Sequence, residues 1–178
     1  MLLTKFGHAC VRSQTRDVTL VSDPGALTED AAAEGADAIL VTHEHLGHFL
    51  ESRIRAVARG NRDLRVRTVA PVAELLTGLD DQVRTVSHGD VFTTAGFHVS
   101  AYGAWHAPWA RMSELIDWVR KVSPERAVAV HDAAINPTGI AVVGGLLGEK
   151  GPGINATYDR LEPMRPYEVG ADEQVLSA

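Results

Sequence analysis

Histidine is the residue type in this sequence with the clearest potential for chemistry, since 8 histidines stand beside 1 cysteine among 178 residues. Three of them, His43, His45 and His48, lie within six residues of one another. Neutral imidazole suits zinc, manganese, iron or nickel, and alternate side chains of a loop can converge on one ion. With a single cysteine, such a site must use nitrogen and oxygen ligands. The segment predicts a divalent-metal site, and the alternative is a polar loop that caps a helix.

Two more histidines follow apolar runs in the second half of the chain. His106 comes directly after Trp105, and His131 ends the run Ala127–Val130. Taken alone, each is more typical of a packed or surface histidine. Like His43, however, both stand where a predicted strand ends, which indicates that they converge on one rim of a sheet.

The other candidate residues have both functional and structural interpretations. His8 could line a pocket or satisfy a backbone group, and Asp23 could brace a ligand histidine or serve only its Asp-Pro-Gly turn. His88 lies in a predicted turn, and His98 alternates with apolar neighbours and should face solvent. Cys10 is more typical of an inert buried residue than of a nucleophile.

Short runs rich in Val and Leu predict the strands that position these residues. Three of them open the chain and suggest an antiparallel start, at Leu2–Phe6, Ala9–Ser13 and Val18–Ser22. The run Ala38–Val41 is apolar throughout, as expected for a strand buried on both faces. It ends at the histidine segment, and the place between a buried strand and a following helix is where α/β proteins keep their chemistry.

The remaining elements complete an α/β pattern. We expect further strands at Val66–Ala70, Val83–Val86, Val91–Tyr102 and Ala127–Val130, with Ser87–Asp90 as a hairpin turn. We expect helices at Thr28–Glu34 with a threonine cap, Phe49–Ala58, Pro71–Thr77 with proline in the first turn, Met112–Val122 and Pro137–Leu147. Strands followed by helices indicate an α/β sandwich (α+β by some schemes) rather than a barrel, in one domain over residues 1–178.

Composition excludes several classes of function. The formal charge is −6, with 17 Lys and Arg against 23 Asp and Glu and no basic run, which argues against a nucleic-acid-binding protein. No run of about 20 apolar residues is present to cross a membrane, and the first residues do not resemble an export signal. We therefore expect a cytoplasmic protein that acts on a small-molecule substrate or ligand.

The ordered motifs bring the sequence to a family. His43-x-His45-x-Gly47-His48 resembles the metallo-β-lactamase superfamily motif His-x-His-x-Asp-His. Its frame is similar to the branch of L-ascorbate-6-phosphate lactonase-like hydrolases, through Gly7-His8-Ala9-Cys10, Asp23-Pro24-Gly25, Gly103-x-x-His106-Ala107 and His131-Asp132. The resemblance implies a metallo-β-lactamase-like αββα sandwich with a metal centre on the rim between two sheets.

By position, the resemblance assigns His43, His45 and His106 to a first metal site and His48 and His131 to a second. Members of the family usually use two ions to activate water against a lactone, amide, thioester or phosphate ester. The physical basis is general, because a cation lowers the pKa of bound water and polarises the group under attack.

The sequence departs from the family pattern at two places. Gly47 replaces the motif aspartate, and no match is found to the bridging aspartate or to the core strands expected after His106, so the sandwich should be truncated in its second half. Two missing carboxylates leave five neutral imidazoles to hold two dications, which repel one another strongly. We therefore expect one ion per chain rather than two, with zinc favoured over manganese, iron or nickel.

The sequence is compatible with a one-metal hydrolase and with a relative that has lost or changed this activity. The group that would replace the catalytic carboxylate is unknown, with Glu44 and Asp132 as weak candidates. The alternative is a catalytically altered or inactive relative that binds a metal or ligand or acts as a scaffold, and a deliberately shortened chain is a third possibility. Missing strands would expose sheet edges, so we also expect a homo-oligomer, with a dimer favoured.

Overall fold

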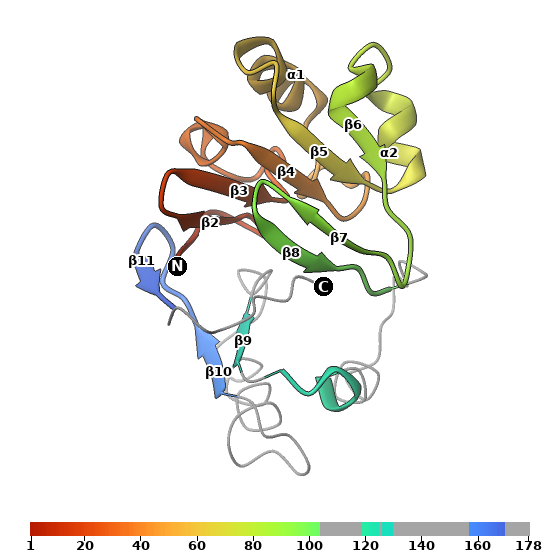
Figure 1. The fold of residues 1–178 in the computed structure, drawn as a ribbon. Helices are drawn as coiled ribbons and strands as arrows, with labels where there is room; N and C mark the ends of the chain where they lie inside the picture. The colour runs from red at the N-terminus through yellow and green to blue at the C-terminus, as the bar shows by residue number, and fades with distance from the viewer. Residues whose placement is uncertain (104–118, 125, 130–156, 170–178) are drawn as a thin grey trace.

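The fold is described from a computed structural model, which places residues 1–103, 119–124, 126–129 and 157–169 (Figure 1). Its main feature is a seven-stranded sheet in the order β11-β1-β2-β3-β4-β5-β6. The strands of this sheet are β1 (Leu2–Lys5), β2 (Val11–Thr15), β3 (Val18–Ser22), β4 (Ala38–Val41), β5 (Arg65–Thr68), β6 (Val83–Thr85) and β11 (Pro166–Glu168).

The sheet is antiparallel at one side and parallel at the other. Strands β1, β2 and β3 pair antiparallel, as the sequence predicts, while β3, β4, β5 and β6 pair parallel. Parallel neighbours need a crossover connection, and here helical segments supply it. These are the 3₁₀ helix η1 (Asp30–Ala33), α1 (Glu51–Gly60), α2 (Ala70–Leu75) and the 3₁₀ helix η2 (Asp80–Gln82).

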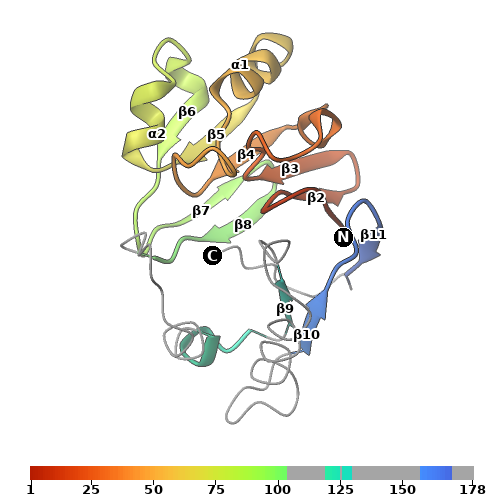
Figure 2. The same cartoon turned by 180° about the vertical axis from the view of Figure 1, so that it is seen from behind.

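The two faces of the sheet have different partners (Figures 1 and 2). One face packs against α1 and α2 through a core that includes Val21, Ile39, Ile54 and Val72. The other face meets a hairpin of β7 (Val91–Thr94) and β8 (Phe97–Ser100), in an apolar cluster around Leu40. A further parallel pair, β9 (Arg126–Ala129) with β10 (Thr157–Arg160), forms a separate two-stranded sheet. The result is a layered mixed α/β fold.

Strand β4 has the boundaries and the burial that the sequence predicts. All four of its residues are buried, because helices cover one of its faces and the β7–β8 hairpin covers the other. The apolar pattern therefore locates the element that precedes the histidines.

The predicted helix at Thr28–Glu34 is wrong in type and in its cap. The helical residues are Asp30–Ala33 and form a 3₁₀ turn, and the N-cap position belongs to Glu29 without a side-chain capping bond. The Oγ1 of Thr28 instead contacts the Glu29 carboxylate at 3.3 Å. Four helical residues are too few for an α-helical turn to propagate, so the local bonds tighten to the 3₁₀ form.

The prediction of one strand from Val91 to Tyr102 is also wrong, since a hairpin occupies this region. Ala95 and Gly96 turn the chain with φ of 47° and 79°, the left-handed pair that joins antiparallel strands in a tight turn. Ser87–Asp90 does form a turn, but it connects β6 to β7, which belong to different sheets, so it is not a hairpin turn.

Smaller differences concern boundaries. Strand β5 ends at Thr68 because Ala70 already begins α2, whose first turn contains Pro71 as predicted. His98 is exposed, as its alternation predicts. The predicted helix at Pro137–Leu147 and most of the helix at Met112–Val122 lie outside the described residues. Strands β10 and β11 were not predicted, and β11 covers the outer edge of β1.

No helix in the described part of the chain is both long and apolar enough to cross a membrane.

Candidate metal centre

The histidine segment and the Asp23 turn lie side by side because their strands are parallel neighbours. Strand β3 ends at Ser22 and β4 at Val41, so the residues that follow both emerge at the same edge of the sheet. A backbone hydrogen bond from Asp23 to Leu40 fastens the two segments together (2.8 Å). The carboxyl ends of parallel strands are the usual place for a site in such folds.

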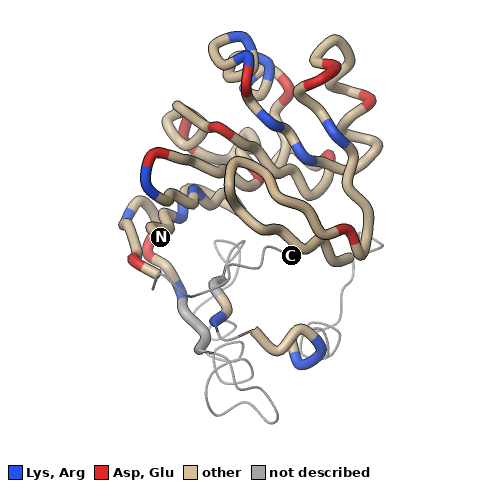
Figure 3. Tube along the Cα trace, viewed as in Figure 1, with Lys and Arg blue, Asp and Glu red and all other residues tan. Residues whose placement is uncertain are grey.

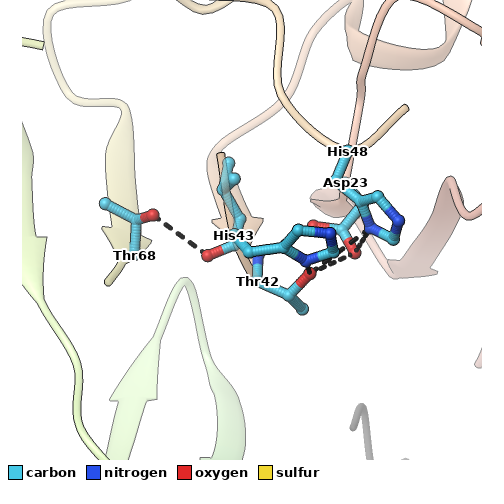
Figure 4. Close-up of polar contacts among 6 residues, drawn as sticks. Asp23, Thr42, His43, His48 and Thr68 are labelled. Carbon is cyan, nitrogen blue, oxygen red and sulfur yellow. Dashed lines mark hydrogen bonds and ion pairs between the residues drawn. The ribbon is translucent and has the colours of Figure 1, made fainter. Parts of the chain in front are cut away.

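Asp23 organises the residues around it through three hydrogen bonds. Its Oδ1 accepts the backbone N–H of Thr42 at 2.8 Å, and its Oδ2 accepts the Thr42 hydroxyl at 2.9 Å. The same Oδ2 lies 2.9 Å from Nδ1 of His48 (Figure 4). The carboxylate is buried, and its φ of 48° is a left-handed conformation that Asp tolerates better than most residues.

These bonds determine which nitrogen carries the proton on two imidazole rings. A carboxylate only accepts, so His48 donates its Nδ1–H to Asp23, and Thr42 donates its hydroxyl proton to the same carboxylate. The Thr42 oxygen then accepts Nδ1–H of His43, at 2.9 Å. In the neutral form of both rings the lone pair is then on Nε2, which is the state that a metal ligand needs.

The three histidines of the segment differ in exposure but lie together. The rings of His43 and His48 are 3.9 Å apart between centroids, and those of His43 and His45 are 4.7 Å apart. His48 is buried, His43 is half-buried and His45 is exposed. The three rings therefore form one cluster at the end of β4.

His8 approaches this cluster from the turn between β1 and β2. Its ring meets that of His48 edge to face, with centroids 5.3 Å apart. A Cβ built on Gly47 would lie 2.3 Å from Nε2 of His8, so the imidazole fills the space that a side chain at position 47 would need. The Glu29 carboxylate accepts the N–H of Gly7 at 2.8 Å and supports this turn, and the same bond lowers the pKa of Glu29.

Two features that the sequence did not reveal fix the Asp23 turn beneath the histidines. Gly25 packs against the histidine segment so closely that an added Cβ would lie 2.2 Å from the backbone carbon of Gly47. Arg53 of α1 donates to the carbonyl oxygens of Pro24, Gly25 and Thr28. Arginines are common on helix surfaces, so no local pattern distinguishes Arg53 as part of the site.

The described donors are of the right chemical type for a divalent metal, since two of them are imidazoles whose Nδ1 is engaged in a hydrogen bond. Among the residues that the structure describes, however, no three His, Cys, Asp or Glu side chains are arranged to enclose an ion. The other predicted ligands, His106 and His131, lie outside the described residues, as does Asp132. Glu44 is exposed and has no hydrogen bond or ion pair to any described residue.

Comparison with known proteins decides the family. A family model described as a beta-lactamase superfamily domain matches residues 2–131, which is most of the chain. The chain belongs to this family. Within the beta-lactamase superfamily, the match includes the three clustered histidines and both segments that follow β3 and β4.

Two relatives in sequence are similarly distant from this β-lactamase superfamily member. Protein Rv0786c of Mycobacterium tuberculosis is 28% identical over 195 residues, covering 84% of this chain and 92% of the relative. UPF0173 protein PYRAB01190 of Pyrococcus abyssi is 28% identical over 106 residues, covering 60% of this chain and 50% of the relative.

Solved structures share the fold of this superfamily member. A protein from Parabacteroides distasonis described as a metal-dependent hydrolase aligns with a TM-score of 0.66 and 16% identity, over 90% of this chain and 92% of its own. Igni18, a metallo hydrolase from Ignicoccus hospitalis, aligns with a TM-score of 0.57 and 13% identity, over 95% of this chain and 99% of its own. The isothiocyanate hydrolase from Delia radicum gut bacteria aligns with a TM-score of 0.57 and 14% identity, over 96% of this chain and 100% of its own.

Proposed function

We propose that this protein is a metal-dependent hydrolase that holds one divalent cation per chain, with zinc favoured. Family membership supports the reaction class. The observation that carries the proposal is the pair of hydrogen bonds that engage Nδ1 of His43 and His48 and leave Nε2 of the neutral rings to face a metal. A carboxylate and a threonine that hold imidazoles in this way are the outer partners typical of metal ligands.

In this proposal His43, His45 and His106 hold the ion, and His48 and His131 are the remaining donors near it. A divalent cation bound there would lower the pKa of water and polarise the carbonyl or phosphoryl group of a lactone, amide or phosphoester substrate. Asp23 and Thr42 keep the rings in one tautomer and orientation. Arg53 and Gly25 keep the Asp23 turn in place beneath them.

One ion is favoured over two because carboxylates are scarce in the described part of the site. Position 47 is glycine, and the His8 ring occupies the space beside it. The buried Asp23 carboxylate is already hydrogen-bonded to Thr42 and His48. Glu44 is exposed and makes no hydrogen bond or ion pair with any described residue. Without carboxylates to offset their charge, two close dications repel strongly.

Metal content and hydrolysis together test the proposal. Elemental analysis of the purified protein should give one tightly held ion per chain. Hydrolysis of simple lactones or of a chromogenic phosphodiester should disappear with a chelator and in His43→Ala and His106→Ala. His98→Ala is the matched control, because this exposed histidine on β8 bonds only Thr93 among the described residues and should keep full activity. Full activity in His106→Ala, or two tightly held ions, contradicts the proposal.

The alternative function is a metal- or ligand-binding protein without hydrolytic activity. Gly47 favours it, because glycine offers neither a ligand nor a proton acceptor at the position where the family motif has aspartate. The same experiments separate the two functions. An ion that binds with the same dependence on His43, in a protein that hydrolyses none of these substrates, would favour the alternative.

We also propose that two copies associate. Strand β6 ends the seven-stranded sheet in the described part of the chain, and an uncovered edge strand tends to pair with another chain. Light scattering at micromolar concentration should give the mass of a dimer. A well-folded monomer under those conditions would contradict this proposal.

A further inference from the structure

Arg67 is placed unusually for a basic residue, on the face of the main sheet that meets the β7–β8 hairpin. It pairs with Leu40 of β4 on one side and with Arg84 of β6 on the other. Its guanidinium carbon lies 5.7 Å from the centre of the Phe92 ring, so the hairpin partly covers it. Figure 3 shows the basic positions along β5 and β6, in the same view as Figure 1.

The guanidinium of Arg67 has no anionic partner and no hydrogen bond within the described part of the chain. Arg53, in contrast, donates to three carbonyl oxygens and to Asp30. Neighbouring Arg65 and Arg84 donate to backbone carbonyls near them. Burial lowers the pKa of Arg67, and the charges of Arg84 and Arg65 lower it further. A guanidinium without a protein acceptor keeps its N–H donors available to an anionic ligand.

Arg67 lines a cleft of about 420 Å³ between the ends of β4 and β5 and the β7–β8 hairpin. Its walls combine apolar side chains, among them Val69, Phe92 and Val99, with a few polar groups. No aspartate or glutamate lines this cleft in the described part of the chain, although the protein carries a formal charge of −6. The cleft is therefore a local region of positive charge with an apolar body, which suits a small organic anion.

A second donor stands in the same cleft. The N–H of Gly103 donates to Nδ1 of His88 at 3.1 Å, so this nitrogen is unprotonated and the ring proton is on Nε2. His88 thus offers an N–H in the same cleft that Arg67 lines. Carboxylate and phosphate oxygens accept from both groups, and such charge-assisted bonds are stronger than neutral ones.

The cleft also reaches the candidate metal centre. Thr42, whose oxygen accepts Nδ1–H of His43, is part of its wall. Leu40, opposite Arg67, precedes His43 by three residues, or about 10 Å of extended chain. A ligand that fills the cleft can therefore reach from Arg67 towards the histidines.

We infer that Arg67 and His88 form an anion-binding subsite, so that the substrate carries a carboxylate or phosphate group on an apolar body. This inference rests on the proposed function for the identity of the ligand as a substrate. It names the substrate class and assigns the recognition of its charge to Arg67. The apolar wall that includes Phe92 and Val99 holds the body of the ligand.

Binding to metal-depleted protein tests the inference without requiring activity. After chelator treatment and dialysis, titration calorimetry should detect phenylacetate or phenyl phosphate, and the stronger of the two shows which anion the cleft prefers. The neutral isostere phenylacetamide should bind at least about tenfold more weakly than phenylacetate, because it lacks the charge. Equal binding of phenylacetate and phenylacetamide, or no binding of either anion, overturns the inference.

Substitutions locate the binding to Arg67. Arg67→Gln should weaken anion binding at least about tenfold, and Arg67→Lys should lose less because it keeps the charge. Arg65→Gln and Arg84→Gln are matched controls on the same face that do not line the cleft, and they should keep the wild-type affinity. Thermal melting shows whether each variant is folded. If Arg67→Gln is unfolded, Arg67→Lys and His88→Ala carry the test, and wild-type affinity in both overturns the inference.

The binding and hydrolysis experiments can fail separately, so they distinguish the anion-binding subsite from the proposed hydrolase function. If the metal-depleted protein binds the anion through Arg67 but the metal-bound protein hydrolyses none of the substrates, the subsite is supported and the hydrolase proposal is contradicted. If the metal-bound protein hydrolyses neutral and anionic esters equally and Arg67→Gln leaves KM unchanged, the hydrolase proposal is supported and the subsite is contradicted.

Discussion

The histidine segment and the arginine cleft lie at the same end of the parallel strands, but their polar groups are held differently. At the histidines, Asp23 and Thr42 bond to Nδ1 of two rings and fix them. In the cleft, the guanidinium of Arg67 has no acceptor among the described residues. Held groups suit a centre whose geometry must not change, whereas an open donor suits a ligand that comes and goes. The two regions therefore indicate different tasks, and four experiments test the first side of this contrast, the held groups in and around the histidine region.

Gly25→Ala should have the largest effect, because the added Cβ would overlap backbone atoms of Gly47 and His48 at 2.2 to 2.4 Å. Backbone cannot move aside as a side chain can, so we expect a loss of about 3 kcal/mol in the free energy of unfolding and loss of metal binding. Urea denaturation and elemental analysis measure both.

Gly60→Ala is the control for Gly25→Ala, since Gly60 ends α1 with nothing within 4 Å of an added Cβ. It should be neutral or more stable by up to about 1 kcal/mol, because alanine reduces the freedom of the unfolded chain. Wild-type metal content in Gly25→Ala would show that the histidine segment is not held in the way we describe.

Asp23→Asn should have the next largest effect, and mainly on the metal. The amide NH₂ would donate to Nδ1 of His48 and move the ring proton to Nε2, so His48 could no longer serve as a donor near the ion and metal affinity should fall about 10-fold. Asp37→Asn is the matched control, because its carboxylate also accepts a backbone N–H, from Thr19 at 2.8 Å, but far from the histidines along β4. Equal metal affinities for the two variants would contradict the role given to Asp23.

Gly47→Asp tests the space that His8 occupies. The new side chain must displace the His8 ring, and we expect a loss of about 1–2 kcal/mol in the free energy of unfolding. His8→Ala combined with Gly47→Asp should recover stability and raise the metal content above that of the wild type, because a carboxylate then joins the site. Gly47→Asp with wild-type stability, or a double variant with unchanged metal content, would contradict this account.

Cys10 should give the smallest effect, and it tests whether its thiol is buried in the folded protein. Burial raises the pKa of its thiol from 9.0 to about 12, so the folded protein holds this proton more tightly than the unfolded chain. The Cys10 contribution to stability is therefore complete below pH 9 and is lost as the pH rises from 9 to 12. Iodoacetamide at pH 8 should leave the folded protein unmodified and label it in denaturant, and fast labelling of the folded protein would contradict the burial.

Much of the scaffold was predictable from local pattern. The continuous apolar run at Ala38–Val41 is typical of a buried strand, and the antiparallel start followed from short strands broken by turns. The turn at Ala95 and Gly96 escaped prediction because apolar residues alternate across it, and the type of helix near Thr28 was wrong because four residues do not determine a helix type. Strand β11 was missed because its pairing with β1 joins distant parts of the chain.

In the candidate site too, some residues were predictable from local sequence pattern and others were not. His43, His45 and His48 were predictable because they are close in sequence and follow a buried strand, and the exposed alternation of His98 was predictable from its strand. Arg53 and Gly25 were not, because their roles depend on contacts with segments more than twenty residues away. His106 and His131 stay predictions, as do the specific branch of the family and the loss of strands after His106.

The sequence by itself determined the chemistry available to this protein, since a cluster of histidines with one cysteine restricts the donors to nitrogen and oxygen. It also indicated the position of that cluster, because a short apolar run bounded by turn residues is typical of a buried strand. Only the tertiary structure decided which ring nitrogens act as donors, what fills the space beside Gly47, and that the half-buried Arg67 has no anionic partner among the described residues. These properties depend on atoms brought together across strands, and no pattern in the linear sequence encodes such distances.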